Sequence, residues 1–165
     1  MKRIMIAVLG LLMLLPLVAC GKGKDAGWKD FTTGGVTLTM GEKCADALKT
    51  LSPSCTKTTP RASCWKGSTG EEVVYEYRTL GIRLKTYREK ENDPNEILTG
   101  IELRSDTAET PEGITIGSTT DAVRAAYGEP LSEDNTRFLY RKGDATLEFT
   151  IKDGKVSAVN YFAKE

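Results

Sequence analysis

Apolar and polar residues alternate with a period of two in six short runs of the chain, a pattern typical of strands that bury one face. Three of the runs lie in the first half of the chain, at 72–78, 82–87 and 97–103, and three lie in the second, at 136–141, 145–151 and 156–162. Short turn segments separate the runs, and one of them contains Asp153-Gly154, a dipeptide typical of tight hairpins. The alternation therefore predicts two three-stranded antiparallel meanders.

A helical stretch is expected before each meander. The segments that begin at Gly41 and Gly117 align with each other, and apolar residues four positions apart then fall on one helix face in both. The side-chain oxygens of 118–121 provide a start signal for the second helix, and 127–130 provide a stop signal through a glycine and a proline. The first helix is expected to end before Pro53.

Neither helix–meander unit alone carries enough apolar residues for a large core, so the two units are expected to combine. The sequence predicts an α+β fold in which two tandem helix–three-stranded-meander repeats form one antiparallel sheet, with the helices packed on one face. The repeats would span 35–105 and 111–163 of a single domain over 35–165. Residues 20–34, rich in glycine and lysine, are expected to be a flexible tether.

The start of the chain has the composition of an export signal. Two basic residues precede an apolar run over 4–18, which is too short and too interrupted to span a membrane. The run ends in Leu-Val-Ala before Cys20 and resembles a bacterial lipobox, which implies removal of a signal peptide over 1–19 and lipid attachment (palmitate) at Cys20. The protein would then be anchored to the outer face of the cytoplasmic membrane, or to the outer membrane of a cell that has two. The alternative is an ordinary signal peptide cleaved near Ala19, which would leave Cys20 as a free thiol.

Composition narrows the classes of function. The 165 residues include 23 Lys and Arg, 23 Asp and Glu, and no histidine. A balanced charge gives no net field that would draw the protein to nucleic acid. The missing histidine removes the commonest general base and transition-metal ligand, and makes a Ser-His-Asp triad impossible. We therefore expect no enzyme, no cofactor, no metal site and no nucleic acid partner.

Three cysteines follow Cys20, and an exported chain meets an oxidising compartment. Three thiols can pair in only three ways. We expect a disulfide between Cys55 and Cys64, because the proline-containing loop between them would let them meet at the junction of a helix and a strand. Closing so short a loop stabilises a fold by about 3 kcal/mol in the chain-entropy model. Cys44 would then be a small apolar residue or a free thiol, and the other two pairings stay open.

The polar positions of the predicted strands form a charged sheet face. Basic side chains interleaved with glutamates could dock a partner by complementary charge. The alternative is a ladder of cross-strand ion pairs on a solvated face. Trp65 is an anchor candidate because interface cores favour tryptophan, although it could equally cover the core. The candidate partner-binding residues are Trp65, Arg78, Arg83, Lys85, Tyr87, Arg137 and Arg141.

Several motifs resemble those of a family of uncharacterised bacterial, mostly Gram-positive, lipoproteins. They are Ser63-Cys64, Tyr75-Glu76-Tyr77, Thr86-Tyr87 and the segment 111–118. The resemblance covers nearly all of the mature domain and implies a fold and a membrane address, but no activity. More remotely, the tandem arrangement is similar to the β-lactamase-inhibitor-protein fold, and a single copy is similar to the BamE/SmpA outer-membrane assembly lipoproteins. The inhibitors bind their enzyme through a sheet face rich in aromatic residues, whereas the corresponding face here is charged.

We therefore expect a membrane-anchored extracytoplasmic lipoprotein that acts as a non-catalytic protein-binding module for an envelope or secreted protein. One alternative is an inhibitor of an extracellular enzyme, which would insert a loop such as 56–61 or 92–96 into the catalytic cleft. The other is a protein that binds a small ligand or cell-wall fragment between the sheet and the helices.

Overall fold

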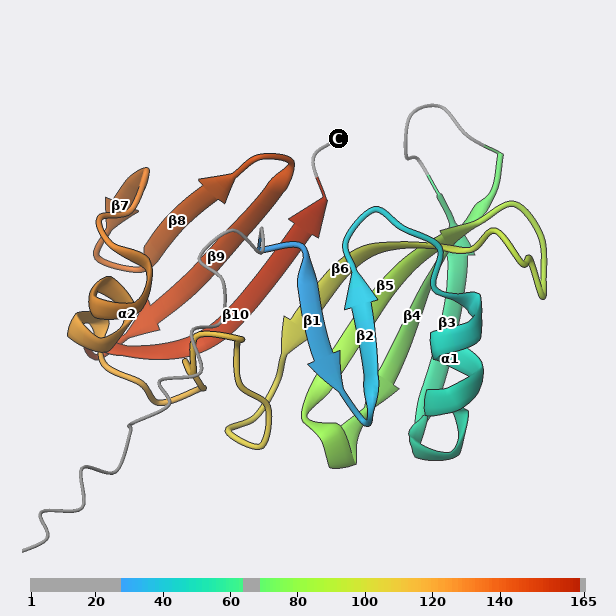
Figure 1. Ribbon diagram of the computed structural model, residues 1–165, viewed down its shortest axis with the longest axis horizontal. Coiled ribbons are helices and arrows are strands. Elements are labelled where there is room, and N and C mark those ends of the chain that lie inside the picture. Colours follow the sequence, from blue (N-terminus) through green and yellow to red (C-terminus); the bar gives the residue numbers. More distant parts are fainter. Residues whose placement is uncertain (1–27, 64–68, 164–165) are drawn as a thin grey trace, which may run out of the picture.

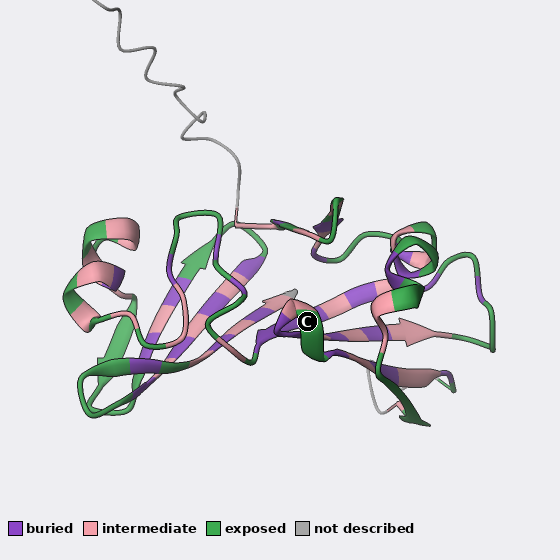
Figure 2. Cartoon of the chain, turned by 90° about the horizontal axis from the view of Figure 1, so that it is seen from below, coloured by how far each residue is buried: buried purple, intermediate pink, exposed green. Residues whose placement is uncertain are grey.

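The computed structural model describes residues 28–63 and 69–163. An antiparallel sheet of eight strands, in the order β3-β4-β5-β6-β10-β9-β8-β7, forms one layer (Figure 1). Two short helices and a separate two-stranded hairpin lie on one side of this sheet (Figures 1 and 2). The sheet strands are β3 (Lys57–Ala62), β4 (Glu71–Tyr77), β5 (Ile82–Arg88), β6 (Ile97–Leu103), β7 (Ser132–Asp134), β8 (Arg137–Lys142), β9 (Ala145–Lys152) and β10 (Lys155–Ala163).

The expected α+β class is confirmed, and the six strands expected from alternation are β4, β5, β6, β8, β9 and β10. The expected repeat of one helix and three strands is not confirmed, because β3 and β7 each stand between a helix and its meander. All residues of β3 and β7 are exposed, so no apolar alternation marks them in the sequence. Both strands occupy the edges of the sheet.

The hairpin joins β1 (Asp30–Thr33) to β2 (Val36–Thr39) through Gly34 and Gly35, whose φ angles are +54° and +79°. Positive φ at both central residues is the requirement of the tight turn that matches strand twist, and glycine meets it without strain. Phe31 faces Leu38 across the hairpin, and both are buried. The tether expected over 20–34 is therefore wrong for its last residues, since burial of Phe31 makes this segment part of the core.

The helices are α1 (Ala45–Leu51) and α2 (Thr120–Tyr127). The expected start of α2 is confirmed, because the Thr119 side chain accepts a hydrogen bond from the Ala122 backbone N–H at 3.2 Å. Its expected end is also confirmed, with Gly128 directly after Tyr127. Within residues 28–63 and 69–163, no helix has the length and apolar composition needed to cross a membrane.

The core lies between the sheet and the layer of helices and hairpin. Its most deeply buried side chains come from the middle strands: Leu84, Leu98, Ile101, Leu103, Leu147, Phe149 and Val159. An aromatic cluster closes the core near α2, where the Trp28 ring lies edge-on to Tyr127 and Tyr140, with ring centroids 5.3 and 6.0 Å away. Trp28, the first described residue, therefore packs against the core on the helix side of the sheet.

The disulfide expected between Cys55 and Cys64 is not formed in this structure, where Cys55 is a free thiol. Cys64 lies outside the described residues, one position after Ser63. Strand β3 is extended, and the Ser63 N–H continues its ladder by donating to the Gly70 carbonyl at 3.0 Å. At a rise of about 3.3 Å per residue the ends of 57–63 are about 20 Å apart. Bridged cysteines need Cα atoms within about 7 Å, so a strand has replaced the loop that was expected to bring the thiols together.

We expect thiol reactivity to separate the two described cysteines. Burial, followed by the nearby charge of Glu96, raises the pKa of Cys44 to about 12, and the Cys44 thiol donates to the Glu96 carbonyl at 3.4 Å. Iodoacetamide at pH 8 without reductant should label Cys55, which is half-buried, and leave Cys44 unlabelled until denaturant is added. Peptide mass spectrometry reads both sites in one digest. Labelling of Cys55 only after reduction would contradict the extended path of β3.

Candidate functional site

The second face of the eight-stranded sheet carries no helix or hairpin among the described residues (Figure 2). We call it the open face. Alternate residues of the strands point to it, and their register aligns Glu76 of β4, Arg83 of β5, Glu102 of β6 and Asn160 of β10 in one row. Such neighbours lie close enough across strands for direct contact.

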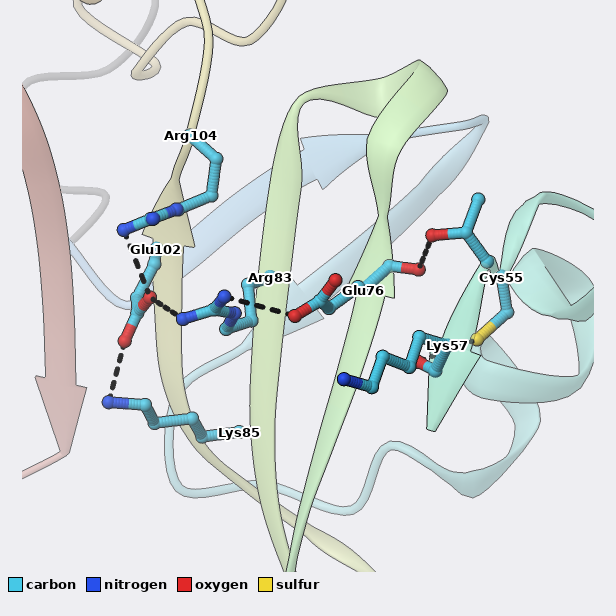
Figure 3. Close-up of polar contacts among 8 residues, drawn as sticks. Cys55, Lys57, Glu76, Arg83, Lys85, Glu102 and Arg104 are labelled. Atoms are coloured by element: carbon cyan, nitrogen blue, oxygen red, sulfur yellow. Dashed lines mark hydrogen bonds and ion pairs between the residues drawn. The ribbon is translucent and has the colours of Figure 1, made fainter. Parts of the chain in front are cut away.

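Arg83 bridges the two carboxylates of this row (Figure 3). Its Nη2 donates to Glu76 Oε1 at 3.0 Å, and its Nη1 donates to Glu102 Oε2 at 3.1 Å. Lys85 Nζ lies 2.6 Å from the other oxygen of Glu102. The ladder of ion pairs considered from the sequence is therefore present on this half of the sheet.

Glu102 is the centre of the ladder, with its side chain only 11% exposed. Burial by itself raises the pKa of Glu102, but the hydrogen bond and charge of Lys85 and the charges of Arg83 and Arg104 outweigh it and hold the pKa below its ordinary value. Gly100 helps Lys85 to reach this carboxylate. A Cβ on Gly100 would lie 3.4 Å from Cβ and Cδ of Lys85, so the lysine stem crosses β6 over a position that has no side chain.

The half of the open face built by β3–β6 carries more positive than negative charge, although the whole chain is neutral. Its carboxylates are Glu72, Glu76 and Glu102. Its cationic side chains are Lys57, Arg61, Arg78, Arg83, Lys85 and Arg104. Six cations against three carboxylates leave a local excess that can attract an anionic group.

A pocket of about 260 Å³ opens where this half of the face ends. Three arginines line it: Arg78 from the 3₁₀ turn η3 (Arg78–Leu80), Arg83 from β5, and Arg104 just after β6. We call it the arginine pocket. The turn that shapes it depends on Gly81, because its φ is +67° and a Cβ there would lie 2.2 Å from Ser105 Oγ.

A second hollow of about 240 Å³ lies on the helix side, between α1 and the loop before β6. Several of its polar side chains are already engaged. Tyr75 donates its hydroxyl to Glu96 Oε1 at 2.9 Å, Arg88 donates to Glu71 at 2.9 and 3.0 Å, and Asp93 accepts two backbone N–H groups. Within the part of the sequence that the structure describes, no three acidic or cysteine side chains gather into a group that could hold a metal ion.

The residues predicted from sequence fall into two places on the open face. Arg78, Arg83 and Lys85 lie together with Tyr87 on the β3–β6 half. Arg137 and Arg141 are exposed on β8, four strand spacings from β5, which is about 19 Å. Trp65, like the lipidation candidate Cys20, lies outside the described residues.

Sequence reasoning missed Lys57 and Arg104 as members of the open face. Lys57 belongs to β3, which has no apolar alternation. Arg104 lies one residue beyond the last residue of β6, and continuing the alternation from Glu102 would have placed it on the same face. Arg78, in contrast, was expected at a strand end and instead begins η3.

No protein-family model matches the chain, and no curated protein matches it either. Among solved structures, the chain is similar to the crystal structure of a DUF4309 family protein (YjgB) from Bacillus subtilis, a Gram-positive bacterium. The two are 16% identical, the TM-score is 0.46, and the match covers 82% of this chain and 88% of that one. A likeness at this distance assigns neither a family nor a function to the chain.

We expect Glu102→Gln to destabilise the fold by about 2–3 kcal/mol at pH 7, because it leaves partly buried cations without their carboxylate. A lowered pKa means that the stability due to the charge is present above the unfolded-state pKa and is lost as pH falls through the folded-state pKa. The difference in the free energy of unfolding between wild type and variant should therefore become smaller at low pH. Urea unfolding at pH 7 and pH 3 measures it.

Glu148→Gln is the matched control, on the same face. Among the described residues, Glu148 has one ion-pair partner, Arg137, whose Nη1 lies 3.6 Å from Glu148 Oε2, so the substitution should change stability by no more than about 0.5 kcal/mol. Equal effects of the two substitutions would show that the Glu102 ladder contributes no special stability.

Proposed function

We propose that the protein is a membrane-anchored extracytoplasmic lipoprotein whose open face binds an acidic segment of an envelope or secreted protein, without catalysing a reaction. The observation that carries this proposal is the excess of cations on the β3–β6 half of the open face. Complementary charge speeds the encounter of two proteins and helps to select partners.

The ion pairs of the ladder decide which cations are available to a partner. Arg83 and Lys85 are held by Glu76 and Glu102, so they serve mainly to fix the face. Lys57 and Arg78 are exposed and make no ion pair with any described residue. We therefore assign partner contact chiefly to these outer cations and treat the Arg83 ladder as their support.

The proposed anchor is compatible with access to the open face. Trp28 packs on the helix side, and Lys29 lies 3.7 Å from Asp144 at the same end of the domain. Trp28 lies eight positions after the lipidation candidate Cys20, a span of at most about 28 Å. A lipid on Cys20 would attach the tether on the helix side, which leaves the open face accessible to a partner.

We expect Cys20→Ser to abolish incorporation of a clickable palmitate analogue and to release the protein from the membrane fraction. Cys55→Ser is the matched control and should keep both properties, because only Cys20 follows the lipobox-like residues. Retention of the lipid label in Cys20→Ser would refute the anchor, as would an unmodified Cys20 thiol in the mature wild-type protein.

Site-specific photo-cross-linking in intact cells tests the binding function. We expect a cross-linker at Thr59, on the open face, to capture an acidic protein, and one at Thr50, on α1, to capture none. Lys57→Glu with Arg78→Glu should remove the Thr59 cross-link, while the control Lys49→Glu on α1 should keep it. Thermal melts confirm that the variants fold. Capture from Thr50, or capture that survives the charge reversal, would contradict the proposal.

A further inference from the structure

The arginine pocket brings together three guanidinium groups from parts of the sequence that are distant from one another. Arg78, Arg83 and Arg104 line one hollow together with Glu76 and Ser105. Strand β5 places Arg83 in the centre, η3 supplies Arg78, and the segment leaving β6 supplies Arg104 (Figure 3 shows Arg83 and Arg104).

Much of the hydrogen-bonding capacity of these arginines is unused. Arg83 commits both Nη atoms to glutamates, but its Nε is buried and has no hydrogen-bond partner among the described residues. Arg104 Nη1 lies 3.7 Å from Glu102, which is too far for a hydrogen bond. The Arg78 side chain makes no hydrogen bond or ion pair with any described residue. The free side-chain donors of Arg78 and Arg104 are therefore available to a ligand that supplies acceptors, and the unpaired Nε–H of Arg83 belongs to a third arginine of the same pocket.

The local charge favours an anionic group in the pocket. Glu76 and Glu102 balance Arg83 and Lys85, which leaves the charges of Arg78 and Arg104. The planar donor fork of arginine matches a carboxylate in two parallel hydrogen bonds.

We propose that the arginine pocket is the recognition site for a carboxylate group of the acidic protein segment, bound by Arg78 and Arg104 next to the Arg83 guanidinium. This assignment rests on the proposed function, since it names the group that the open face recognises. The carboxylate belongs either to an Asp or Glu side chain or to the C-terminus of a polypeptide, and both present the same acceptor geometry.

Titration of the full-length protein in nonionic detergent, followed by the NMR signals of the arginine Nε–H groups, tests the assignment. Three probes separate the sources: acetylated hexaglutamate amide has carboxylates on its side groups only, hexaglutamine with a free C-terminus has a terminal carboxylate only, and inorganic phosphate has none. We expect one or both peptides to shift the Arg83 Nε–H signal saturably, and phosphate to bind more weakly.

Variants locate the binding. Arg78→Gln with Arg104→Gln should weaken peptide binding at least about tenfold, because two charge-assisted contacts are lost. Arg141→Gln, an exposed arginine on β8 of the same face, should leave the affinity within about twofold. Equal weakening in the two variants would overturn the pocket in favour of a diffuse electrostatic effect, and so would tighter binding of phosphate than of either peptide.

The outcome is independent of the cross-linking result. An acidic partner captured from Thr59, together with peptides that do not bind the pocket, would overturn the pocket assignment alone. Peptides that saturate the pocket, with no partner captured from Thr59, would overturn the proposed function and leave a carboxylate site on the protein.

Discussion

The pairing of β6 with β10 is the constraint on which the rest of the structure depends. These strands belong to different halves of the chain, and their register places Ile101 opposite Tyr161 and Leu103 opposite Val159. All four side chains are buried on the helix side. Because this single ladder joins the halves, it makes one continuous core out of two units that would each be too thin to exclude water.

The same register determines the open face. Side chains alternate along a strand, so burying Ile101 and Leu103 turns Glu102 to the other side, next to Arg83 and Lys85. A carboxylate in the middle of a wide sheet is shielded by its neighbours and needs cations in contact. Arg83 and Lys85 on the neighbouring strand supply these cations. Arg78 and Arg104, at the edge of the face, keep side-chain donors that no carboxylate occupies. The strand register that buries the core thus also places the ion pairs of Glu102 and the available arginines on the open face.

The sequence predicts the strands that bury one face, but it does not predict β3 and β7, whose residues are all exposed to solvent. Period-two alternation identifies β4–β6 and β8–β10 closely, and capping by a threonine hydroxyl identifies the start of α2 at Thr119. The β1–β2 hairpin carries too few apolar residues for this test, although Gly34-Gly35 is the signal that would have identified it. Overlooking β3 also produced the disulfide prediction, since an extended strand keeps Cys55 away from the end of that strand.

The site was predictable in kind but not in detail. Alternation places Arg83 and Lys85 on one face, yet it does not show which cations are held by carboxylates and which stay available. That division depends on side-chain reach across strands, including the path of Lys85 over Gly100, and on the turn at Gly81 that brings 104–105 beside Arg78. Both are contacts between residues far apart in the sequence.

The edge strand β3 affects whether copies of the protein associate with one another at high density. A free sheet edge offers a row of backbone donors and acceptors on which an identical edge can polymerise. Ser63 donates inward to Gly70, and the antiparallel ladder alternates, so the nitrogen of Pro60, three residues earlier, faces outward and has no hydrogen to offer. Lys57 on the same strand adds repulsion between like edges, whereas the charge of Arg61 is offset by Glu72. A surface densely populated with this domain would therefore keep its molecules separate, each able to diffuse to its own encounter.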